Sequence, residues 1–338
     1  GFYNYYQEHN NNNMLTQPNS SIGDNLNYPF VLLAGRLREM GHTVSTIDTE
    51  NLATYDVIVF IEFPGESNPY LKKLVAKKFQ NAYLVLLESP AIKPDNYDIK
   101  NHAYFKKIFT WDDNLVDGIR YFKIQYSHLI PPTINFDINK KEKLCTLISS
   151  NKSTSHPREL YSQRIGAIRW FEKNQAQDFD LYGKGWDRHN FEGTFLGVKI
   201  ARLNRLSLLT KLLALDYPSY KGSVTSKKDT YQKYKFAICY ENVEGFTGYI
   251  TEKIMDCFLG GCVPIYLGAP NIGEHIPENT FVDKRRFSTY EALYSYIKNM
   301  PDTEYMGYIE AIKHFLTSEK VQPFSAEYLA NTIIKQIV

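Results

Sequence analysis

Carboxylate, amide, hydroxyl and lysine side chains gather in one short segment of the sequence, residues 241–253. A carboxylate can accept hydrogen bonds from both hydroxyls of a ribose, a lysine can neutralise a phosphate, and a tyrosine can line a base or a sugar. An ordinary solvated loop can carry the same residue types. Here they coincide with two glycines and the start of a predicted helix, so we interpret the segment as a phosphate- and sugar-binding loop. Its polar residues are Glu241, Asn242, Glu244, Tyr249, Glu252 and Lys253.

The elements around this segment form a predicted βαβ unit. The apolar run at 236–240 and the run at 263–267 are each typical of a buried strand. Between them, Thr251 is a suitable N-cap, and Gly260 with Gly261 supplies a helix stop. In an open parallel sheet the strand carboxyl ends and the helix N-termini meet at one edge, where nucleotides bind. We therefore expect segment 241–253 to lie at that edge.

The motifs YKFAICYEN, GYITEK and VPIYLG, between residues 234 and 268, resemble the donor-binding signature of the α1,3/4-fucosyltransferases, glycosyltransferase family ten. The resemblance implies an α/β fold of GT-B architecture, in which two Rossmann-like domains with parallel sheets face each other across a cleft. It also implies an enzyme that transfers L-fucose from GDP-fucose, with inversion, to O3 of an N-acetylglucosamine in an N-acetyllactosamine-type acceptor. No cofactor is expected.

Glu88 is the candidate general base. It follows a predicted strand in Leu87-Glu88-Ser89-Pro90, and a carboxylate at a strand's carboxyl end points into the cleft of an α/β domain. The family has an equivalent Glu-Ser-Pro, whose glutamate is taken as the base that deprotonates the acceptor hydroxyl. Glu62, in a similar Glu-Phe-Pro context, is our second choice. Asp112 and Asp113 are weaker candidates.

The resemblance also assigns the donor site. Arg158 and Glu252 match the family motifs. The resemblance implies that Arg158 binds the diphosphate of the donor and that Glu252 binds the ribose. Lys253 would be the second cation on the diphosphate. Arg164 and Arg169 are expected to be exposed on the helix that follows Arg158. A metal is not expected, because no Asp-X-Asp motif ends a strand in the second domain. The further candidate donor residues are Ser150, Asn151, Lys184, Tyr240, Asn242 and Tyr249.

Two other functions compete with this hypothesis. Glu244 and Glu252 resemble the two-glutamate motif of retaining GT-B glycosyltransferases that use another nucleotide sugar. The second alternative is an inactive nucleotide- or sugar-binding module, which would be expected to lack Glu88 or the pair of Arg158 and Lys253.

Alternating helix and strand patterns predict three parts along the chain. Residues 1–135 form an acceptor-binding domain, 136–320 a donor-binding domain, and 321–338 a helix that packs back on the first domain. Residues 1–20 are expected to be loosely ordered except for a strand near Phe2. Residues 42–47 are predicted as a strand and 201–215 as a helix.

Composition excludes several partners. The net charge of +2 does not favour nucleic-acid binding, and no window is apolar and long enough for a membrane span. Three of the four cysteines, Cys239, Cys257 and Cys262, lie in apolar runs and are predicted to be small core residues. The four cysteines have neither disulfide nor zinc spacing, which favours a cytoplasmic location, with peripheral contact to the inner membrane face as a variant. Animal members of the family carry an N-terminal anchor, and this sequence shows none. It is therefore expected to be a bacterial or viral member, unless an anchor has been removed from it.

Overall fold

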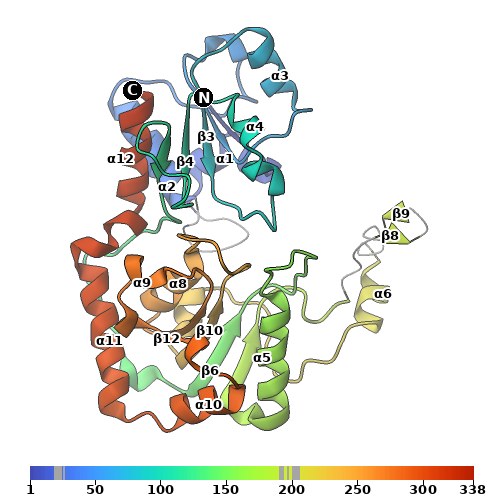
Figure 1. Cartoon of the computed structure of the whole chain (residues 1–338), viewed down its shortest axis with the longest axis vertical. Coiled ribbons are helices and arrows are strands. Elements are labelled where there is room, and N and C mark those ends of the chain that lie inside the picture. Colours follow the sequence, from blue (N-terminus) through green and yellow to red (C-terminus); the bar gives the residue numbers. More distant parts are fainter. Residues whose placement is uncertain (19–24, 26, 190–193, 196–197, 200–205) are drawn as a thin grey trace.

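The computed structural model describes residues 1–18, 25, 27–189, 194–195, 198–199 and 206–338. In this part of the chain, two parallel five-stranded sheets with helices packed on them lie one above the other (Figure 1). The α/β architecture with two parallel sheets is the one that the sequence predicts. A separate antiparallel pair, β8 (Thr194–Phe195) and β9 (Val198–Lys199), lies with α6 (Ser207–Leu212) on a projection from the second half.

The first sheet is buried on both faces, because its strands alternate two apolar side-chain sets. Val59 and Val85 face a cluster that includes α2, whereas Phe60 and Leu84 face a cluster that includes α3. The strands, in sheet order, are β1 (Phe2–Asn4), β2 (Ile58–Ile61), β3 (Ala82–Leu86), β4 (Lys107–Thr110) and β5 (Tyr121–Lys123). The helices are α1 (Asn13–Thr16), α2 (Tyr28–Glu39), α3 (Pro69–Ala76) and α4 (Ile99–His102).

The second sheet has the βαβ unit at its centre. Its strand order is β12 (Val282–Asp283), β11 (Val263–Leu267), β10 (Tyr234–Tyr240), β6 (Lys143–Ile148) and β7 (Phe179–Tyr182). Tyr240 pairs with Leu267, so β10 and β11 end at the same edge. The helices of this half are α5 (Tyr161–Asn174), α7 (Lys227–Tyr231), α8 (Glu252–Leu259), α9 (Ile272–His275), α10 (Tyr290–Lys298) and α11 (Asp302–Thr317).

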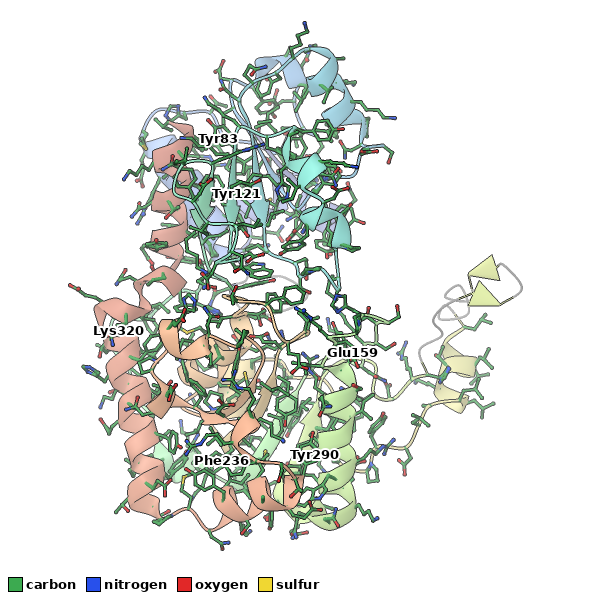
Figure 2. The ribbon with its side chains drawn as sticks, in the orientation of Figure 1. Tyr83, Tyr121, Glu159, Phe236, Tyr290 and Lys320 are labelled. Carbon is green, nitrogen blue, oxygen red and sulfur yellow. The ribbon has the colours of Figure 1, made fainter. Side chains whose placement is uncertain are left out.

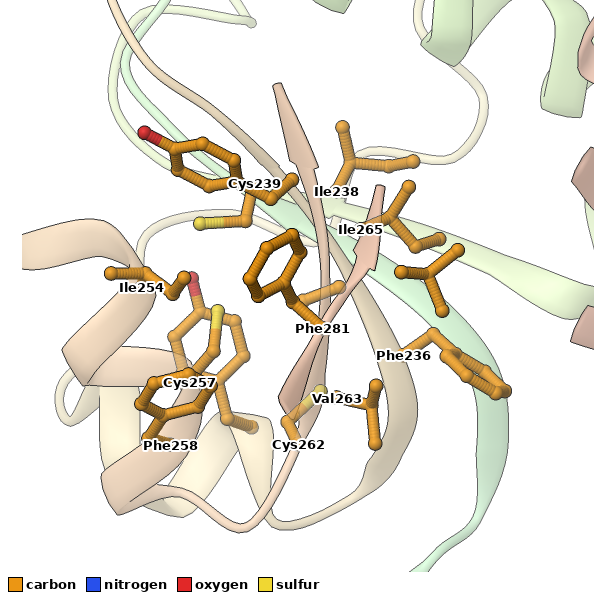
Figure 3. Packing of buried hydrophobic residues seen from close by; sticks show 14 of the residues in the cluster. Phe236, Ile238, Cys239, Ile254, Cys257, Phe258, Cys262, Val263, Ile265 and Phe281 are labelled. Atoms are coloured by element: carbon orange, nitrogen blue, oxygen red, sulfur yellow. The ribbon is translucent and has the colours of Figure 1, made fainter. Parts of the chain in front are cut away.

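The core of the second half forms between β10, β11 and α8. Phe236, Ile254 and Phe258 are at most 1% exposed, and Figure 3 shows Cys239, Cys257 and Cys262 packed among such residues. All four cysteines, Cys145 included, are buried and free. Burial raises the pKa of the Cys145 and Cys257 thiols well above the ordinary value, so they remain protonated. The prediction that Cys239, Cys257 and Cys262 are core residues is confirmed.

The C-terminal helix α12 (Ala326–Ile337) lies against α2 in the first half (Figure 1). Leu329 and Ile333 belong to the same apolar cluster as Val59 of β2. At the edge of this contact, Arg36 Nη1 donates to Asn331 Oδ1 at 2.6 Å. The end of the chain therefore joins the two halves. The domain limits at residues 135 and 320 stay predictions.

The expected loose order of the first twenty residues is wrong for residues 1–18. Asn10 is only 3% exposed, and its side chain both donates to Asn4 O (2.8 Å) and accepts from Asn4 N (2.9 Å). The strand predicted at 42–47 is also wrong, because it contributes one isolated bridge, Phe2 to Thr46. Thr46 N donates instead to Asn12 Oδ1 at 2.7 Å. Asparagine side chains thus take hydrogen-bonding positions that a strand backbone would otherwise occupy.

The helix predicted at 201–215 is found only in part. Residues 201–205 lie outside the described residues, and α6 covers Ser207–Leu212. Apolar periodicity also predicts helices at residues 30–40, 71–79, 158–173, 288–300, 303–317 and 326–337. The observed helices α2, α3, α5, α10, α11 and α12 match these ranges to within a few residues at their ends, where helix boundaries are least sharply defined. Among the described helices, none is long and apolar enough to cross a membrane.

Candidate active site between the two sheets

The two halves share a cavity of about 120 Å³ at the carboxyl ends of their strands. Glu88, which follows β3, lines it from the first half, and Glu252, at the start of α8, lines it from the second. Because parallel strands present their carboxyl ends at one edge, both carboxylates face the junction of the halves. The other lining residues include Asn4, Tyr6, His9, Asn27, Tyr126 and Ser127.

The surroundings of Glu88 change the pKa of its carboxyl group. It is half-buried, and Tyr6 Oη donates to its Oε1 at 3.1 Å. Burial raises the pKa of Glu88 above the ordinary glutamate value, and the charge of Glu252 raises it further. The hydrogen bond from Tyr6 and the charges of Lys152 and Lys253 act in the opposite direction. A carboxylate with a raised pKa is a stronger proton acceptor once it is ionised.

Glu62, our second choice for the base, also lines the cavity, but its carboxylate is engaged in hydrogen bonds within the protein. Its side chain is 2% exposed, and its Oε1 accepts from Leu87 N (3.1 Å) and Glu88 N (2.9 Å). Its Oε2 accepts from Asn96 Nδ2. Burial, together with the charge of Glu88, raises the pKa of Glu62 to about 8. Since three donors occupy its oxygens, this geometry argues against Glu62 as the group that receives a substrate proton.

Asp113 joins the two halves. Its carboxylate accepts from Lys123 Nζ (2.5 Å) in its own half, and from Asn271 Nδ2 (2.9 Å) in the other. It also lies 2.9 Å from His275 Nε2 of the other half. Although burial raises the pKa of Asp113, these hydrogen bonds outweigh burial and lower it well below the ordinary value. A carboxylate held this way is a weak base. Asp112, whose Oδ1 caps Asn114 N at 3.0 Å, does not line the cavity.

Arg164 is the main correction to the predicted donor side. It was expected on the surface, but it is 4% exposed and its Nη2 lies within hydrogen-bonding distance of three acceptors. These are Tyr240 O (2.7 Å), Glu241 O (2.7 Å) and Asn242 Oδ1 (3.0 Å). The guanidinium therefore orders the loop directly after β10, and Asn242 contacts Arg164 rather than open solvent.

A buried charge network holds the start of α8. Thr251 caps the helix, and Glu241, which is fully buried, accepts from Thr251 N at 2.8 Å and from Thr251 Oγ1 at 2.6 Å. Lys253 Nζ lies 3.4 Å from Glu241 Oε2 and 3.6 Å from Glu252 Oε1. Burial raises the pKa of Glu252, but Lys253 and Lys227 outweigh it and lower the pKa to about 2. Glu252 therefore presents a permanent negative charge to the cavity.

Arg158 contacts the same loop from its other side. It is exposed, its Nη1 donates to Gly245 O at 3.2 Å, and its guanidinium lies 5.2 Å from the centre of the Phe246 ring. The neighbouring Glu159 lies at the end of the second half nearest the first (Figure 2). Arg158 thus contacts segment 241–253, to which Lys253 belongs.

The other candidate donor residues divide into two groups. Asn151 N donates to Lys184 O at 2.9 Å, so the loops after β6 and β7 lie together, with Ser150 half-buried and Lys184 exposed. Gly183 permits this approach, because a Cβ there would lie 1.8 Å from Ser149 O. Tyr240 and Tyr249, in contrast, are each 1% exposed.

Tyr240 and Tyr249 are buried and do not line the cavity, and their role in donor binding stays a prediction. Tyr240 packs in the core of the second half. Tyr249 packs on Trp111 of the first half, with ring centres 4.7 Å apart. Tyr249 thus contributes to the contact between the halves.

Sequence reasoning missed Tyr6, Asn96 and the buried role of Arg164. Tyr6 was expected only as part of a first strand, and it lies 82 residues from its partner Glu88 along the chain. Asn96 is fully buried and has no surrounding motif. The signal that could have indicated Arg164 is its place on the apolar side of the predicted helix, with Ala167, Ile168 and Phe171.

Two parallel sheets with a shared cavity at their carboxyl ends define a GT-B glycosyltransferase fold. An alpha1,3-fucosyltransferase solved with GDP-fucose aligns with a TM-score of 0.50 and 17% identity, over 85% of this chain and 80% of that one. A UDP-forming trehalose-phosphate synthase from Burkholderia xenovorans aligns with a TM-score of 0.53 and 11% identity, over 98% and 84%. At these identities the likeness concerns the fold alone.

The particular family follows from sequence comparison. The model of the glycosyltransferase family 10 (fucosyltransferase) C-terminal region matches residues 138–329. The chain belongs to glycosyltransferase family 10, the fucosyltransferases.

Curated relatives match over shorter parts of their length. Alpha-(1,3)-fucosyltransferase FucT of Helicobacter pylori is 36% identical over 76 residues, which is 22% of this chain and 16% of the relative. The rat 4-galactosyl-N-acetylglucosaminide 3-alpha-L-fucosyltransferase 9 is 22% identical over 241 residues, which is 70% of this chain and 54% of the relative. The matched part is therefore less than two thirds of each of these relatives.

Proposed function

We propose that this protein transfers fucose from GDP-fucose to a hydroxyl of a glycan acceptor, with inversion at the anomeric carbon. The observation that carries the proposal is that Glu88 and Glu252 line one cavity from opposite halves. Their pKa values are moved apart, since that of Glu88 is raised and that of Glu252 is lowered. Such a difference suits one carboxylate to accept a proton and the other to remain charged.

In the proposed step, the acceptor hydroxyl oxygen attacks the anomeric carbon of fucose while Glu88 receives the hydroxyl proton. The bond between that carbon and the phosphate oxygen breaks, and GDP leaves with the electron pair. Arg158 and Lys253 would stabilise the charge that develops on the leaving diphosphate. Glu252 would accept hydrogen bonds from the ribose. Ser150, Asn151, Lys184 and Asn242 would complete the donor site.

For the acceptor, we propose O3 of an N-acetylglucosamine in an N-acetyllactosamine-type glycan, on the basis of family resemblance. Tyr6, His9 and Asn27 line the cavity beside Glu88 and offer polar groups to a sugar. The test is an acceptor array incubated with GDP-fucose, with GDP release and the product linkage measured. A product that keeps the anomeric configuration of the donor would support the retaining alternative. GDP-fucose binding without release of GDP by any acceptor would support a binding module.

Removing either donor cation is expected to weaken GDP-fucose binding. Arg158→Ala and Lys253→Ala should each reduce the binding free energy by about 1.5–3 kcal/mol, the value of one hydrogen bond to a charged group. Lys253→Ala should also lower stability, because Glu241 loses its cation in a buried site. Calorimetric titration with GDP measures the affinity. Wild-type affinity in either variant would remove that residue from the donor site.

The reaction is expected to proceed without a divalent metal, because two protein cations take the place of a metal at the diphosphate. Incubation with EDTA followed by desalting should leave most of the turnover. The measurement is initial rate with and without added Mn²⁺ or Mg²⁺. A loss of activity that either ion restores would contradict metal-independent transfer.

A further inference from the structure

The backbone at Leu87 and Glu88 lies beyond the end of β3, so its hydrogen bonds must come from outside the sheet ladder. Glu62 Oε1 accepts from the N–H groups of both residues, at 3.1 and 2.9 Å. Leu87 O accepts from Trp111 Nε1 (2.8 Å) and Tyr126 Oη (2.5 Å). Three side chains from three separate segments therefore fix the peptide that carries the candidate base.

Further contacts restrict Glu88 itself. Glu88 O accepts from Tyr97 Oη at 2.9 Å, and its side chain accepts from Tyr6 Oη at 3.1 Å. Among the residues that the structure describes, Glu62 is the acidic residue that accepts hydrogen bonds from the backbone of Leu87 and Glu88. The N–H groups of Leu87 and Glu88 need an acceptor, and the Glu62 carboxylate provides it. Trp111, Tyr97 and Tyr126 act here as donors to carbonyl oxygens, so they do not serve these two N–H groups.

Glu62 is itself held in place. Its backbone has a φ of 64°, in the left-handed region that is uncommon for glutamate, and its N–H donates to Val85 O at 2.8 Å. Its Oε2 accepts from Asn96, whose own Oδ1 accepts from Phe63 N at 2.9 Å. Because Asn96 is fully buried and bonded at both ends of its amide, it fixes the orientation of the Glu62 carboxyl group.

We propose that Glu62 is a positioning residue, which fixes the Leu87–Glu88 backbone and thereby aims the Glu88 carboxylate into the cavity. This inference rests on the proposed function in so far as Glu88 is the base. A displacement of a reacting group by about 1 Å costs roughly 10²-fold in rate. Glu62 lines the same cavity, but the proposed effect on the rate comes from the geometry that it gives to Glu88.

The test uses two variants of Glu62 and one matched control. Glu62→Leu keeps the approximate size but removes both acceptors. The double variant Glu62→Gln with Asn96→Asp exchanges the amide and the carboxylate, so that every hydrogen bond of the pair can re-form. Asn68→Ala is the control, because Asn68 is also buried (7% exposed) and accepts from two backbone N–H groups, those of Tyr70 and Leu71.

Glu62→Leu is expected to lower kcat by roughly 10²-fold while the Kd for GDP-fucose stays within about twofold. The exchanged pair should recover kcat to within about fivefold of the wild type. Asn68→Ala should leave kcat unchanged even where its melting temperature falls as far as that of Glu62→Leu. Amide hydrogen exchange at residues 87 and 88, which needs no substrate, should speed up in Glu62→Leu and return to wild-type protection in the exchanged pair.

Unchanged exchange and unchanged kcat in Glu62→Leu would overturn the proposal. The proposal would also be overturned if the double variant Glu62→Gln/Asn96→Asp regained protection from amide hydrogen exchange but stayed inactive. Glu62 would then act in the chemistry itself. An equal loss of kcat in Asn68→Ala would reduce the effect to general stability and would also overturn it. If the wild type transfers no fucose but the exchange results hold, the proposed function fails and the positioning of residues 87 and 88 stands.

Discussion

Replacing Glu88 with glutamine is expected to lower kcat for fucosyl transfer by about 10²- to 10⁴-fold, the usual contribution of a general base. Glutamine keeps the shape of the side chain and can still accept the hydrogen bond from Tyr6, but it cannot take the acceptor proton. Donor affinity and thermal stability should stay near those of the wild type, because Glu88 lies in the half opposite the proposed donor loop. Steady-state kinetics and calorimetric titration with GDP-fucose measure the two quantities.

The pH profile provides the control for this variant. Burial raises the pKa of Glu88 above the ordinary 4.5, so the wild-type kcat should fall as the pH drops through a value higher than 4.5. The acidic limb should then disappear in Glu88→Gln, which has no proton to lose at that site. A Glu88→Gln enzyme with wild-type kcat would exclude Glu88 from proton transfer, and Glu62, which lines the same cavity, would be tested next, before Asp112 and Asp113.

Replacing Arg164 with methionine is expected to cost at least about 3 kcal/mol of folding stability. The guanidinium serves two buried backbone carbonyls and the Asn242 side chain, and a hydrogen bond to a charged group is worth about 1.5–3 kcal/mol. Methionine fills much of the space but donates nothing, so those acceptors remain buried without that partner. Because the same bonds order the loop after β10, GDP affinity should fall as well.

Arg169→Met, on the same helix, is the matched control. Its side chain is 40% exposed, pairs with Glu172 and donates to one backbone carbonyl, Asp216 O, at 2.6 Å. Because this side chain reaches solvent and serves one carbonyl rather than two, Arg169→Met should cost less stability than Arg164→Met. Urea unfolding compares the two variants, and titration with GDP measures the donor site. Equal stability losses in Arg164→Met and Arg169→Met would contradict the special role of the buried guanidinium.

Local patterns were sufficient to predict most strands and helices. The run at 236–240, with its helix stop at Gly260 and Gly261, indicates a βαβ unit because buried parallel strands are continuous apolar runs. The donor motif lies within one such unit, so its residues are brought together by elements that are close along the chain, β10, α8 and β11. For the same reason Thr251 could be recognised as a helix cap.

The sequence by itself determined the family, the two-sheet architecture and the segments from which Glu88, Glu252 and Lys253 come. Only the tertiary structure decided which polar residues face the cavity and which are buried. The sequence predicts Glu62 as a possible cleft carboxylate and Arg164 as a surface charge. Both are buried instead, and each binds backbone atoms of a segment that is distant along the chain. Such pairings have no local periodicity, because the need to satisfy buried backbone groups arises only when separate segments exclude water together.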